Sequence, residues 1–203
     1  MQALIRKLLE APDFPLIADQ MQLVAKEEAE KRAKFLEEIT PEMKAEFING
    51  EVILHSPAKL RHLEVTLELA TQFRSYTRTT GRGKVLMEKC LISLTRNDFE
   101  PDIVWFSEDK AREFQPDQMR FPAPDLVVEV LSPSTEARDR GVKMVDYAFH
   151  GVSEYWIIDS EANTLEQYVL EGEHYLLHEK RHNGALTPQC MPELKIDLDA
   201  VFS

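Results

Sequence analysis

The chain has 203 residues, 43% of them hydrophobic and 30% charged, which suits one ordinary soluble domain with a sizeable core. The net charge of −12 counts against binding nucleic acid by bulk electrostatics, so a phosphate backbone would need a local basic groove or bound metal ions. No apolar run reaches the roughly 18 to 20 residues that span a bilayer, and the first residues lack the apolar region of a signal peptide. Cys90 and Cys190 form no close pair, which indicates free thiols in a cytoplasmic protein.

The N-terminal segment has the composition of an exposed helix. Residues 19–39 have a middle, from Lys26 to Lys34, that is nearly all charge and alanine, which predicts a projecting or loosely packed helix with a partner contact. Its thin apolar stripe comprises Leu23, Val24, Phe35, Leu36 and Ile39. Thr40 followed by Pro41 predicts the start of another short helix.

A hairpin and a helix are predicted next. Asn49 and Gly50 lie between two apolar runs, which is a strong signal for a two-residue hairpin turn. Ser56 and Pro57 then predict the start of a helix that ends in the segment 79–83. The expected packing stripe of this helix consists of Leu60, Leu63, Leu67, Ala70 and Phe73.

The rest of the chain alternates between strands and one further helix. The apolar patterns predict three strands, over 85–94, 103–106 and 126–131. A helix over 134–150 follows and ends at Gly151. Three later strand candidates read EYWIID, TLEQYVL and HYLLHE. This order predicts an α+β or mixed α/β fold around one sheet, with added β-hairpins near the C-terminus.

The strand over 126–131 is apolar on both faces except for one carboxylate, that of Glu129. Side chains alternate along a strand, so Val127 and Leu131 flank Glu129 on one face, while the other face is filled by apolar side chains alone. A carboxylate in such a place costs several kcal/mol unless it is paired, protonated or bound to a metal ion. We therefore expect Glu129 to have a partner.

Asp102, which precedes the strand over 103–106, is one candidate partner. If this strand pairs antiparallel with the next one, Asp102 approaches Glu129, whereas Asp125 lies at the far end. Two close acids favour a cation between them, and an oxygen-rich pair suits Mg²⁺ in contact with substrate phosphates. A core ion pair between Glu129 and a lysine or arginine explains the buried acid equally well.

The helix over 134–150 offers an amine. Its expected packing stripe is formed by Val142, Val145 and Phe149. Lys143 lies on a neighbouring face, from which it could point toward the end of the Glu129 strand. By itself, this pattern favours an ordinary surface pair between Lys143 and Asp139, four residues earlier.

Four more side chains are auxiliary candidates for the site. For each of them, an ordinary structural role is the alternative interpretation. Asp125 could contact substrate or a second cation, although a turn role at the start of its strand explains it as well. Glu46 and Glu51 flank the hairpin turn, where a solvated edge is favoured over approach to a cleft. His62, in the first core helix, could touch a phosphate, but most helix histidines in this setting do no chemistry.

Ser132 follows the Glu129 strand and is a further auxiliary candidate, with helix capping as its ordinary role. It does not belong to a serine hydrolase, because the chain has no GxSxG elbow. A Walker loop and a GxGxxG fingerprint are absent as well. Two interpretations fit the arginines of this region equally well: they form a basic rim for nucleic acid, or they are scattered and solvated. These arginines are Arg78, Arg82, Arg138 and Arg140.

Three stretches of the chain resemble the Uma-two family of endonucleases, a branch of the PD-(D/E)xK nuclease superfamily: PDIVWF, APDLVVEVLSPST and RDRGVKMVDYAFHGVSEYWIID. A fourth, EFINGEVILHSPAKLRHLEVTLEL, is similar to the N-terminal hairpin and helix of that family. The resemblance begins at about residue 44 and continues to the C-terminus. It divides the chain into an N-terminal helical arm, 1–43, and a nuclease domain, 44–203.

The resemblance implies a restriction-endonuclease-like core sheet flanked by helices, and metal-dependent hydrolysis of DNA. It implies that Asp102 takes the place of the first aspartate of the motif and Glu129 that of its second acid. Leu131 stands where the usual lysine is found, and Lys143 on the following helix supplies the amine. Mg²⁺ or Mn²⁺ would be held by Asp102, Glu129 and the Val130 carbonyl, while Lys143 orients the nucleophile or stabilises developing negative charge.

Two other functions compete with a DNA endonuclease. A catalytically silent nuclease-like module, which binds or assembles through the N-terminal arm, is favoured by Leu131 and by the net charge of −12. A metal-dependent hydrolase of small phosphate esters would need no basic groove. The arm and the exposed strand edges also favour a homodimer, since cutting both strands of DNA often uses two active sites.

Overall fold

The structure is a computed structural model that describes residues 2–203. Its centre is a six-stranded sheet with the strand order β11-β10-β9-β8-β6-β3. Every residue of β6 and β8 is buried, as their apolar sequences predict. The strands of this sheet are β3 (Lys84–Met87), β6 (Ile103–Phe106), β8 (Leu126–Val130), β9 (Glu154–Asp159), β10 (Thr164–Glu171) and β11 (His174–Arg181).

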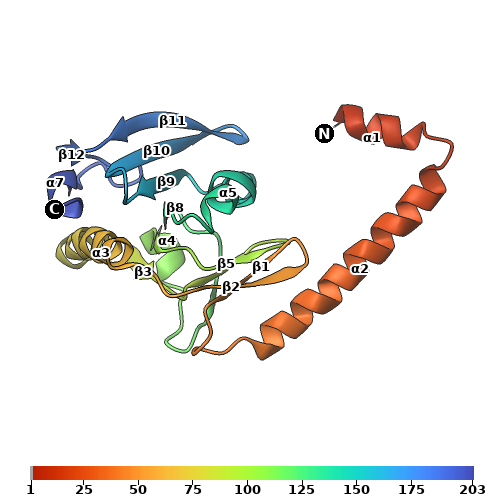
Figure 1. The fold of residues 1–203 in the computed structure, drawn as a ribbon, viewed down its shortest axis with the longest axis horizontal. Helices are drawn as coiled ribbons and strands as arrows, with labels where there is room; N and C mark the ends of the chain where they lie inside the picture. Colours follow the sequence, from red (N-terminus) through yellow and green to blue (C-terminus); the bar gives the residue numbers. More distant parts are fainter. Residues whose placement is uncertain (1) are drawn as a thin grey trace.

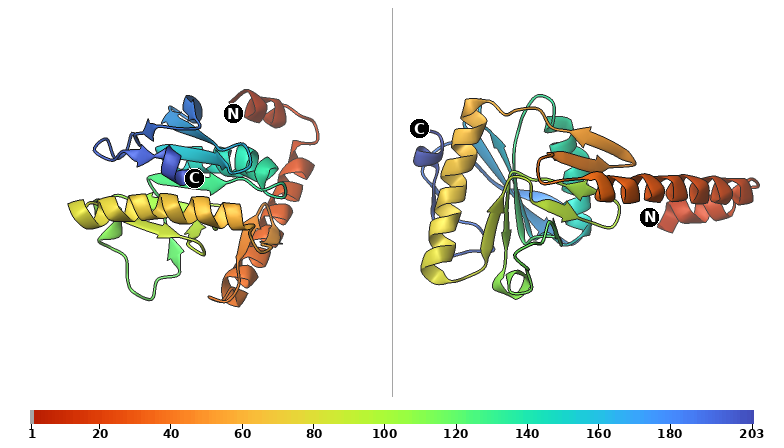
Figure 2. Two further views of the ribbon diagram at one scale, coloured as in Figure 1. Left: turned by 60° about the vertical axis from the view of Figure 1, so that its left-hand side comes forward. Right: turned by 90° about the horizontal axis from the view of Figure 1, so that it is seen from below.

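Helix α3 (Leu60–Thr80) covers one face of the six-stranded sheet (Figure 2). Its buried side chains Leu69 and Phe73 belong to the same core cluster as Val128 and Trp156. The rings of Phe73 and Trp156 have their centroids 5.6 Å apart. Burial of apolar surface on this face therefore joins the helix to the two central strands.

The predicted packing stripe of α3 is wrong in three of its five positions. The exposed members are Leu60, Leu63 and Leu67. Only Ala70 and Phe73 are buried as expected. The helix carries a second apolar stripe, through Val65 and Leu69, and it is this one that packs on the sheet. Because this second stripe faces the sheet, His62 points inward, and only 14% of its side chain is exposed.

The other face of the central sheet packs against a second sheet and a helical segment. The second sheet has five strands in the order β2-β1-β5-β4-β7. They are β1 (Ala45–Ile48), β2 (Glu51–Leu54), β4 (Leu91–Ser93), β5 (Asp98–Phe99) and β7 (Arg120–Phe121). Phe99 of this sheet shares a core cluster with Val127 of β8 and with Tyr147 of the helical segment. The α+β prediction is confirmed, with two main sheets in place of one.

The hairpins are confirmed where the turn residues predicted them. Asn49 and Gly50 join β1 to β2 with φ angles of 51° and 86°, as a two-residue hairpin turn requires. Strands β9, β10 and β11 pair antiparallel in chain order. A small terminal unit follows, with β12 (Ala185–Leu186), β13 (Ile196–Asp197) and α7 (Leu198–Val201).

Two local predictions are wrong. The short helix expected at Thr40 and Pro41 is a turn, closed by a hydrogen bond from the Met43 N–H to the Thr40 carbonyl. The strand expected over 85–94 is interrupted at Glu88 and Lys89, whose φ angles are 49° and 41°. Two successive left-handed residues cannot continue an extended strand, so the chain turns there and Glu88 leaves the line of β3.

The N-terminal arm consists of α1 (Gln2–Leu9) and α2 (Phe14–Glu38), which extend away from the sheets (Figures 1 and 2). The predicted projecting helix is confirmed, because Phe35 is the buried residue of α2. Arg32 anchors its base through hydrogen bonds of 2.6 and 2.9 Å to the Asp98 carboxylate. Within residues 2–203, none of the helices has the length and apolar character needed to cross a membrane.

Candidate active site

Asp102 and Glu129 lie across from each other on neighbouring strands. Strands β6 and β8 pair antiparallel with Ile103 opposite Val128, so the same register sets Asp102 opposite Glu129. The antiparallel pairing expected from the sequence is confirmed. Both acids are buried, with relative exposures of 7% and 3%.

The Asp102 carboxylate is held by several hydrogen-bond donors. Its Oδ2 accepts a hydrogen bond of 2.7 Å from the Val130 N–H, and its Oδ1 lies 3.2 Å from His62 Nε2. The Lys44 ammonium is 3.9 Å away. Burial raises the pKa of Asp102, but the hydrogen bond and charge of His62, the Val130 N–H and Lys44 together hold this pKa below its ordinary value. Asp102 is therefore an ionised carboxylate at neutral pH.

Glu129 meets an amine in a second, enclosed cluster. Lys143 Nζ lies 3.1 Å from the Glu129 carboxylate, 2.9 Å from that of Glu46 and 3.2 Å from that of Asp139. All four side chains are 4% exposed or less. One ammonium thus faces three acids, and the four groups together would carry a net charge of −2 if all were ionised. Glu129 therefore has the partner that its burial requires, and this partner is Lys143.

The proton distribution in this cluster follows from the excess of acids. Burial raises the pKa of Glu129 far above its usual range; Lys143 opposes the shift, and the neighbouring acids reinforce it. Burial also raises the pKa of Glu46, but Lys143 and His55 outweigh it and bring the pKa down to about 2. Burial lowers the pKa of Lys143, but the three surrounding acids raise it well above its ordinary value. The cluster therefore favours the charged form of Lys143 and the protonated form of Glu129.

A kinked turn aims Lys143 into the protein. The helix predicted over 134–150 is divided into α5 (Glu136–Arg138), a wide π-type turn η1 (Asp139–Lys143) and α6 (Met144–Phe149). The kink lies at Gly141, with φ −115° and ψ −105°. The wide turn shifts the face that packs, so the expected stripe is wrong at Val145 and Phe149, which are 70% and 69% exposed. The ion pair expected on the surface between Lys143 and Asp139 exists, but it is buried.

Asp102 opens onto a cavity of about 410 Å³, next to the end of β8. His62 lines it from α3, and Val130 and Ser132 line it from the chain that leaves β8. Basic side chains along the wall include Lys44, His55, Lys59, Arg61 and His62. Glu129 and Lys143 lie behind this wall, among the described side chains that do not line the cavity.

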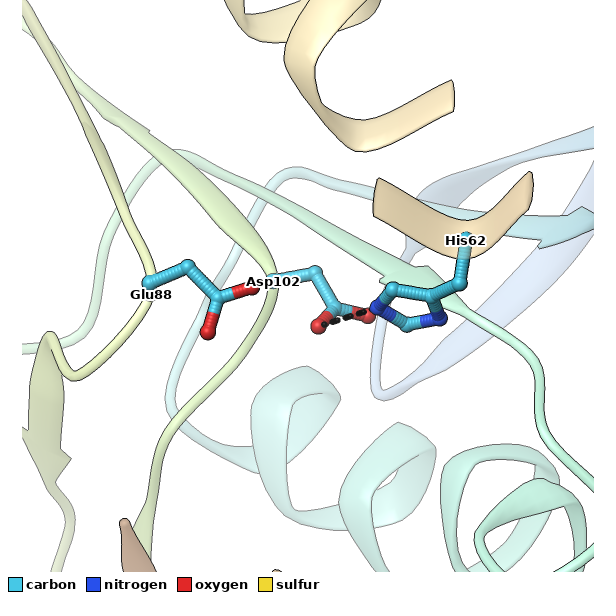
Figure 3. Close-up of side chains that lie close together, drawn as sticks. All are labelled: His62, Glu88 and Asp102. Atoms are coloured by element: carbon cyan, nitrogen blue, oxygen red, sulfur yellow. Dashed lines mark hydrogen bonds and ion pairs between the residues drawn. The ribbon is translucent and has the colours of Figure 1, made fainter. Parts of the chain in front are cut away.

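Three side chains with possible cation ligands meet beside Asp102. A carboxylate oxygen of Asp102, a carboxylate oxygen of Glu88 and a ring nitrogen of His62 lie within 4.8 Å of one another (Figure 3). Carboxylate oxygens and imidazole nitrogens are ligands of divalent cations. The residues around Asp102 therefore fit a divalent metal ion.

Comparison with known proteins identifies the family. The Uma2 family model, described as "Putative restriction endonuclease", matches residues 31–199. The chain belongs to the Uma2 family. A crystal structure from Anabaena variabilis ATCC 29413, titled a "putative nuclease belonging to DUF820", superposes with a TM-score of 0.70 at 19% sequence identity. The match covers 83% of this chain and 94% of that one, which establishes the shared fold. The comparison with curated proteins gave no match.

The auxiliary candidates occupy different places in this Uma2 chain. Ser132 lines the cavity, and its hydroxyl lies 3.0 Å from that of Thr135. Asp125 lies at the far end of β8, where its carboxylate accepts a hydrogen bond from the Ser107 N–H. Glu51 is exposed on β2, as a solvated hairpin edge predicts. The structure thus brings Ser132 to the cavity and keeps Asp125 and Glu51 away from it.

Two of the four arginines that could have formed a basic rim are paired with acids. Arg140 forms an ion pair of 2.6 Å with Glu166, and Arg82 one of 2.7 Å with Glu193. Charges neutralised in this way contribute little attraction for a phosphate backbone. The basic side chains that line the cavity come from other segments, as described above.

Sequence reasoning missed three charged residues of this region. Glu46 was expected at a solvated edge, which is wrong, because it is fully buried against Lys143. Lys44 and Glu88 were not singled out, yet their side chains form an ion pair of 2.6 Å next to Asp102. One signal was present for Glu46: it alternates with apolar residues on a strand whose other positions are all apolar.

Proposed function

We propose that this Uma2 chain is a metal-dependent endonuclease that hydrolyses phosphodiester bonds of DNA. The observation that carries the proposal is the opposition of Asp102 and Glu129 on paired strands in a chain of this family. Asp102 is ionised, lines a cavity and has further cation ligands beside it. These properties suit the binding of a metal ion next to a phosphate.

Asp102 and Glu129, with the Val130 carbonyl as a further ligand, would hold Mg²⁺ or Mn²⁺, and to do so Glu129 would release its proton and turn from the enclosed cluster toward Asp102. When bound, the ion lowers the pKa of a coordinated water molecule and offsets negative charge at the scissile phosphate. The Val130 N–H orients Asp102 by donating to its Oδ2, so that Oδ1, which lies beside His62 Nε2, is the oxygen for a cation. Lys143 acts as a positioning residue, because its ammonium binds Glu129 from the enclosed side and does not line the cavity.

DNA as the substrate is supported by the charges around the cavity. The chain as a whole is acidic, with a net charge of −12, and this disfavours approach of a phosphate backbone. Lys44, Lys59 and Arg61 along the cavity supply the local basic groove that such a chain needs. Lys59 is partly neutralised by Glu161 at 2.8 Å and Lys44 by Glu88 at 2.6 Å, and Lys44 also lies closest to the candidate metal ligands.

The chain would divide into a catalytic domain and an arm for self-association. Residues 44–203 would form the nuclease domain and residues 1–43 an arm that contacts a second copy of the chain. The arm has large exposed apolar side chains, among them Leu9, Leu16 and Met21. Exposed apolar surface of this kind favours association, and a homodimer would bring two active sites to the two strands of DNA.

Cleavage of supercoiled plasmid DNA in Mg²⁺ or Mn²⁺ tests the proposal. Wild type should nick or linearise the plasmid, and Asp102→Asn and Glu129→Gln should abolish cleavage while their circular dichroism stays unchanged. Glu161→Gln is the matched control, because it removes a carboxylate that lines the same cavity outside the metal set. Equal cleavage by wild type and Asp102→Asn would exclude the proposed site.

A catalytically silent DNA-binding module is the second candidate function. It is favoured by the position of Lys143, which three carboxylates enclose, and by Leu131 at the usual lysine position. Such a module would retard DNA in a gel without cutting it in either metal ion. Cleavage that requires Asp102 would exclude this candidate.

A further inference from the structure

Three side chains from separate parts of the chain meet at one point beside Asp102. His62 comes from the first turn of α3, Glu88 from the turn that follows β3, and Asp102 from the residue before β6. Figure 3 shows Asp102 between the other two side chains. Their ligand atoms lie within 4.8 Å of one another, and His62 Nε2 is 3.2 Å from Asp102 Oδ1.

These distances are close to what one cation requires. Two ligands on opposite sides of an ion, each at about 2.1 Å, lie about 4.2 Å apart. Ligands at right angles lie about 3.0 Å apart, so the 3.2 Å between His62 and Asp102 suits neighbouring ligands, and Glu88 is the ligand that must move closer to one of them. Glu88 can provide this movement, because a third of its side chain is exposed, whereas Asp102 is fixed by the Val130 N–H.

The point is also accessible to ions and water. His62 and Asp102 line the cavity of about 410 Å³, and Glu88 lines an adjoining cavity of about 560 Å³. Lys44 and His55 line both, so the two cavities meet at this place. A bound ion could therefore keep water ligands and reach a phosphate oxygen.

A positive charge already occupies this position. Lys44 Nζ is 2.6 Å from a Glu88 carboxylate oxygen and 3.9 Å from Asp102 Oδ1. The two acids thus attract a cation from the solvent side, independently of the enclosed Lys143 cluster. The Lys44 side chain is 25% exposed, which gives its ammonium room to withdraw into the cavity when a divalent ion enters.

The imidazole distinguishes this set from one made of oxygen atoms alone. Mg²⁺ prefers carboxylate and water oxygens, whereas imidazole suits divalent transition metals better. Mn²⁺ accepts both kinds of ligand, so a set of one imidazole and two carboxylates favours Mn²⁺ over Mg²⁺.

We propose that His62 and Glu88, together with Asp102, form a divalent-cation site on the cavity side of Asp102, and that His62 makes it selective for Mn²⁺ over Mg²⁺. The site adds two ligands to the endonuclease centre proposed above, and its use in catalysis rests on that proposal. Binding of the ion does not depend on the proposed endonuclease activity, so it can be measured without DNA.

Titration of the metal-free protein with Mn²⁺, followed by electron paramagnetic resonance, tests the site directly. We expect His62→Ala and Glu88→Gln each to weaken Mn²⁺ binding about tenfold or more. Competition with Mg²⁺ should show that His62→Ala reduces the preference for Mn²⁺, because only the nitrogen ligand is lost. Glu161→Gln and His174→Asn, which remove an acid of the cavity wall and an exposed histidine, should bind like wild type.

A spectroscopic measurement on wild type avoids any dependence on the folding of variants. Mn²⁺ bound by His62 should show electron spin-echo modulation from a directly coordinated nitrogen nucleus. The inference fails if this coupling is missing. It also fails if Asp102→Asn and Glu129→Gln lose Mn²⁺ while His62→Ala binds it normally. In either case the strand acids hold the ion, and the proposed endonuclease function is unaffected. Wild type that binds neither ion would overturn both.

Discussion

Replacing Lys143 with methionine removes the only ammonium that faces three buried carboxylates in the enclosed cluster. Its Nζ is 2.9 to 3.2 Å from oxygens of Glu46, Glu129 and Asp139, and its side chain is 2% exposed. At an effective dielectric constant of about 20, each contact of about 3 Å contributes about 5 kcal/mol before desolvation and repulsion among the acids. Removing one partner of a buried ion pair costs about 3–5 kcal/mol in measured cases, and we expect a loss of this size at pH 7.

The loss should depend on pH in a defined direction. Without the ammonium, burial and mutual repulsion raise the carboxyl pKa values of the folded variant above their unfolded values of about 4. The folded variant then binds more protons than the unfolded chain, so its stability falls as the pH rises. The difference in unfolding free energy between wild type and Lys143→Met should therefore be smaller at pH 5 than at pH 7.

Urea denaturation, followed by the fluorescence of the buried Trp105 and Trp156, measures this free energy. Lys26→Met is the matched control, because its 3.9 Å pair with Glu30 is exposed and should contribute less than about 1 kcal/mol. A loss below about 1 kcal/mol at pH 7 for Lys143→Met would refute the reasoning. The same would follow from an equal loss at pH 5 and pH 7.

Three further results are expected. The pKa of Glu46 is about 2 in the folded protein, so its ionised carboxylate stabilises the fold fully above pH 4.5, and this stabilisation is lost as the pH falls toward 2. In an acid-unfolding titration, Glu46→Gln should therefore lack a pH-dependent stabilisation of about 3 kcal/mol. A Cβ at Gly83 would overlap a backbone carbonyl of β6, so Gly83→Ala should lower the melting temperature more than Gly172→Ala, which has the same left-handed backbone but open space around it. Arg32→Ala should speed hydrogen exchange across α2 while leaving exchange in β8 unchanged, and equal rates in α2 would show that Arg32 does not anchor the arm.

The central strands could be predicted because their constraints are local. Apolar side chains on both faces of β8 require a buried strand, and a lone acid such as Glu129 requires a partner wherever the strand is placed. Two neighbouring strands in antiparallel order then fix which end of β6 lies near Glu129. The position of Asp102 follows from that register alone.

The remaining contacts depend on pairings between distant segments. Glu46 lies 97 residues before Lys143 in the sequence, so no local pattern joins the hairpin to the kinked helix. The packing face of α3 was ambiguous because two apolar stripes overlap, and only the sheet selects between them. The choice matters to the proposed cation site, since the stripe that packs is the one that turns His62 toward Asp102.

The widened turn at Asp139–Lys143 affects how nuclease motifs can be recognised. Its kink at Gly141 lets a lysine fourteen residues after Glu129 bring an ammonium to that acid, although the strand position two residues after Glu129 holds a leucine. Under the proposed function, the helix thus supplies the amine that a strand supplies in the usual motif. A search pattern that fixes the distance between acid and lysine along the chain will overlook such proteins, whereas one that compares positions in three dimensions will find them.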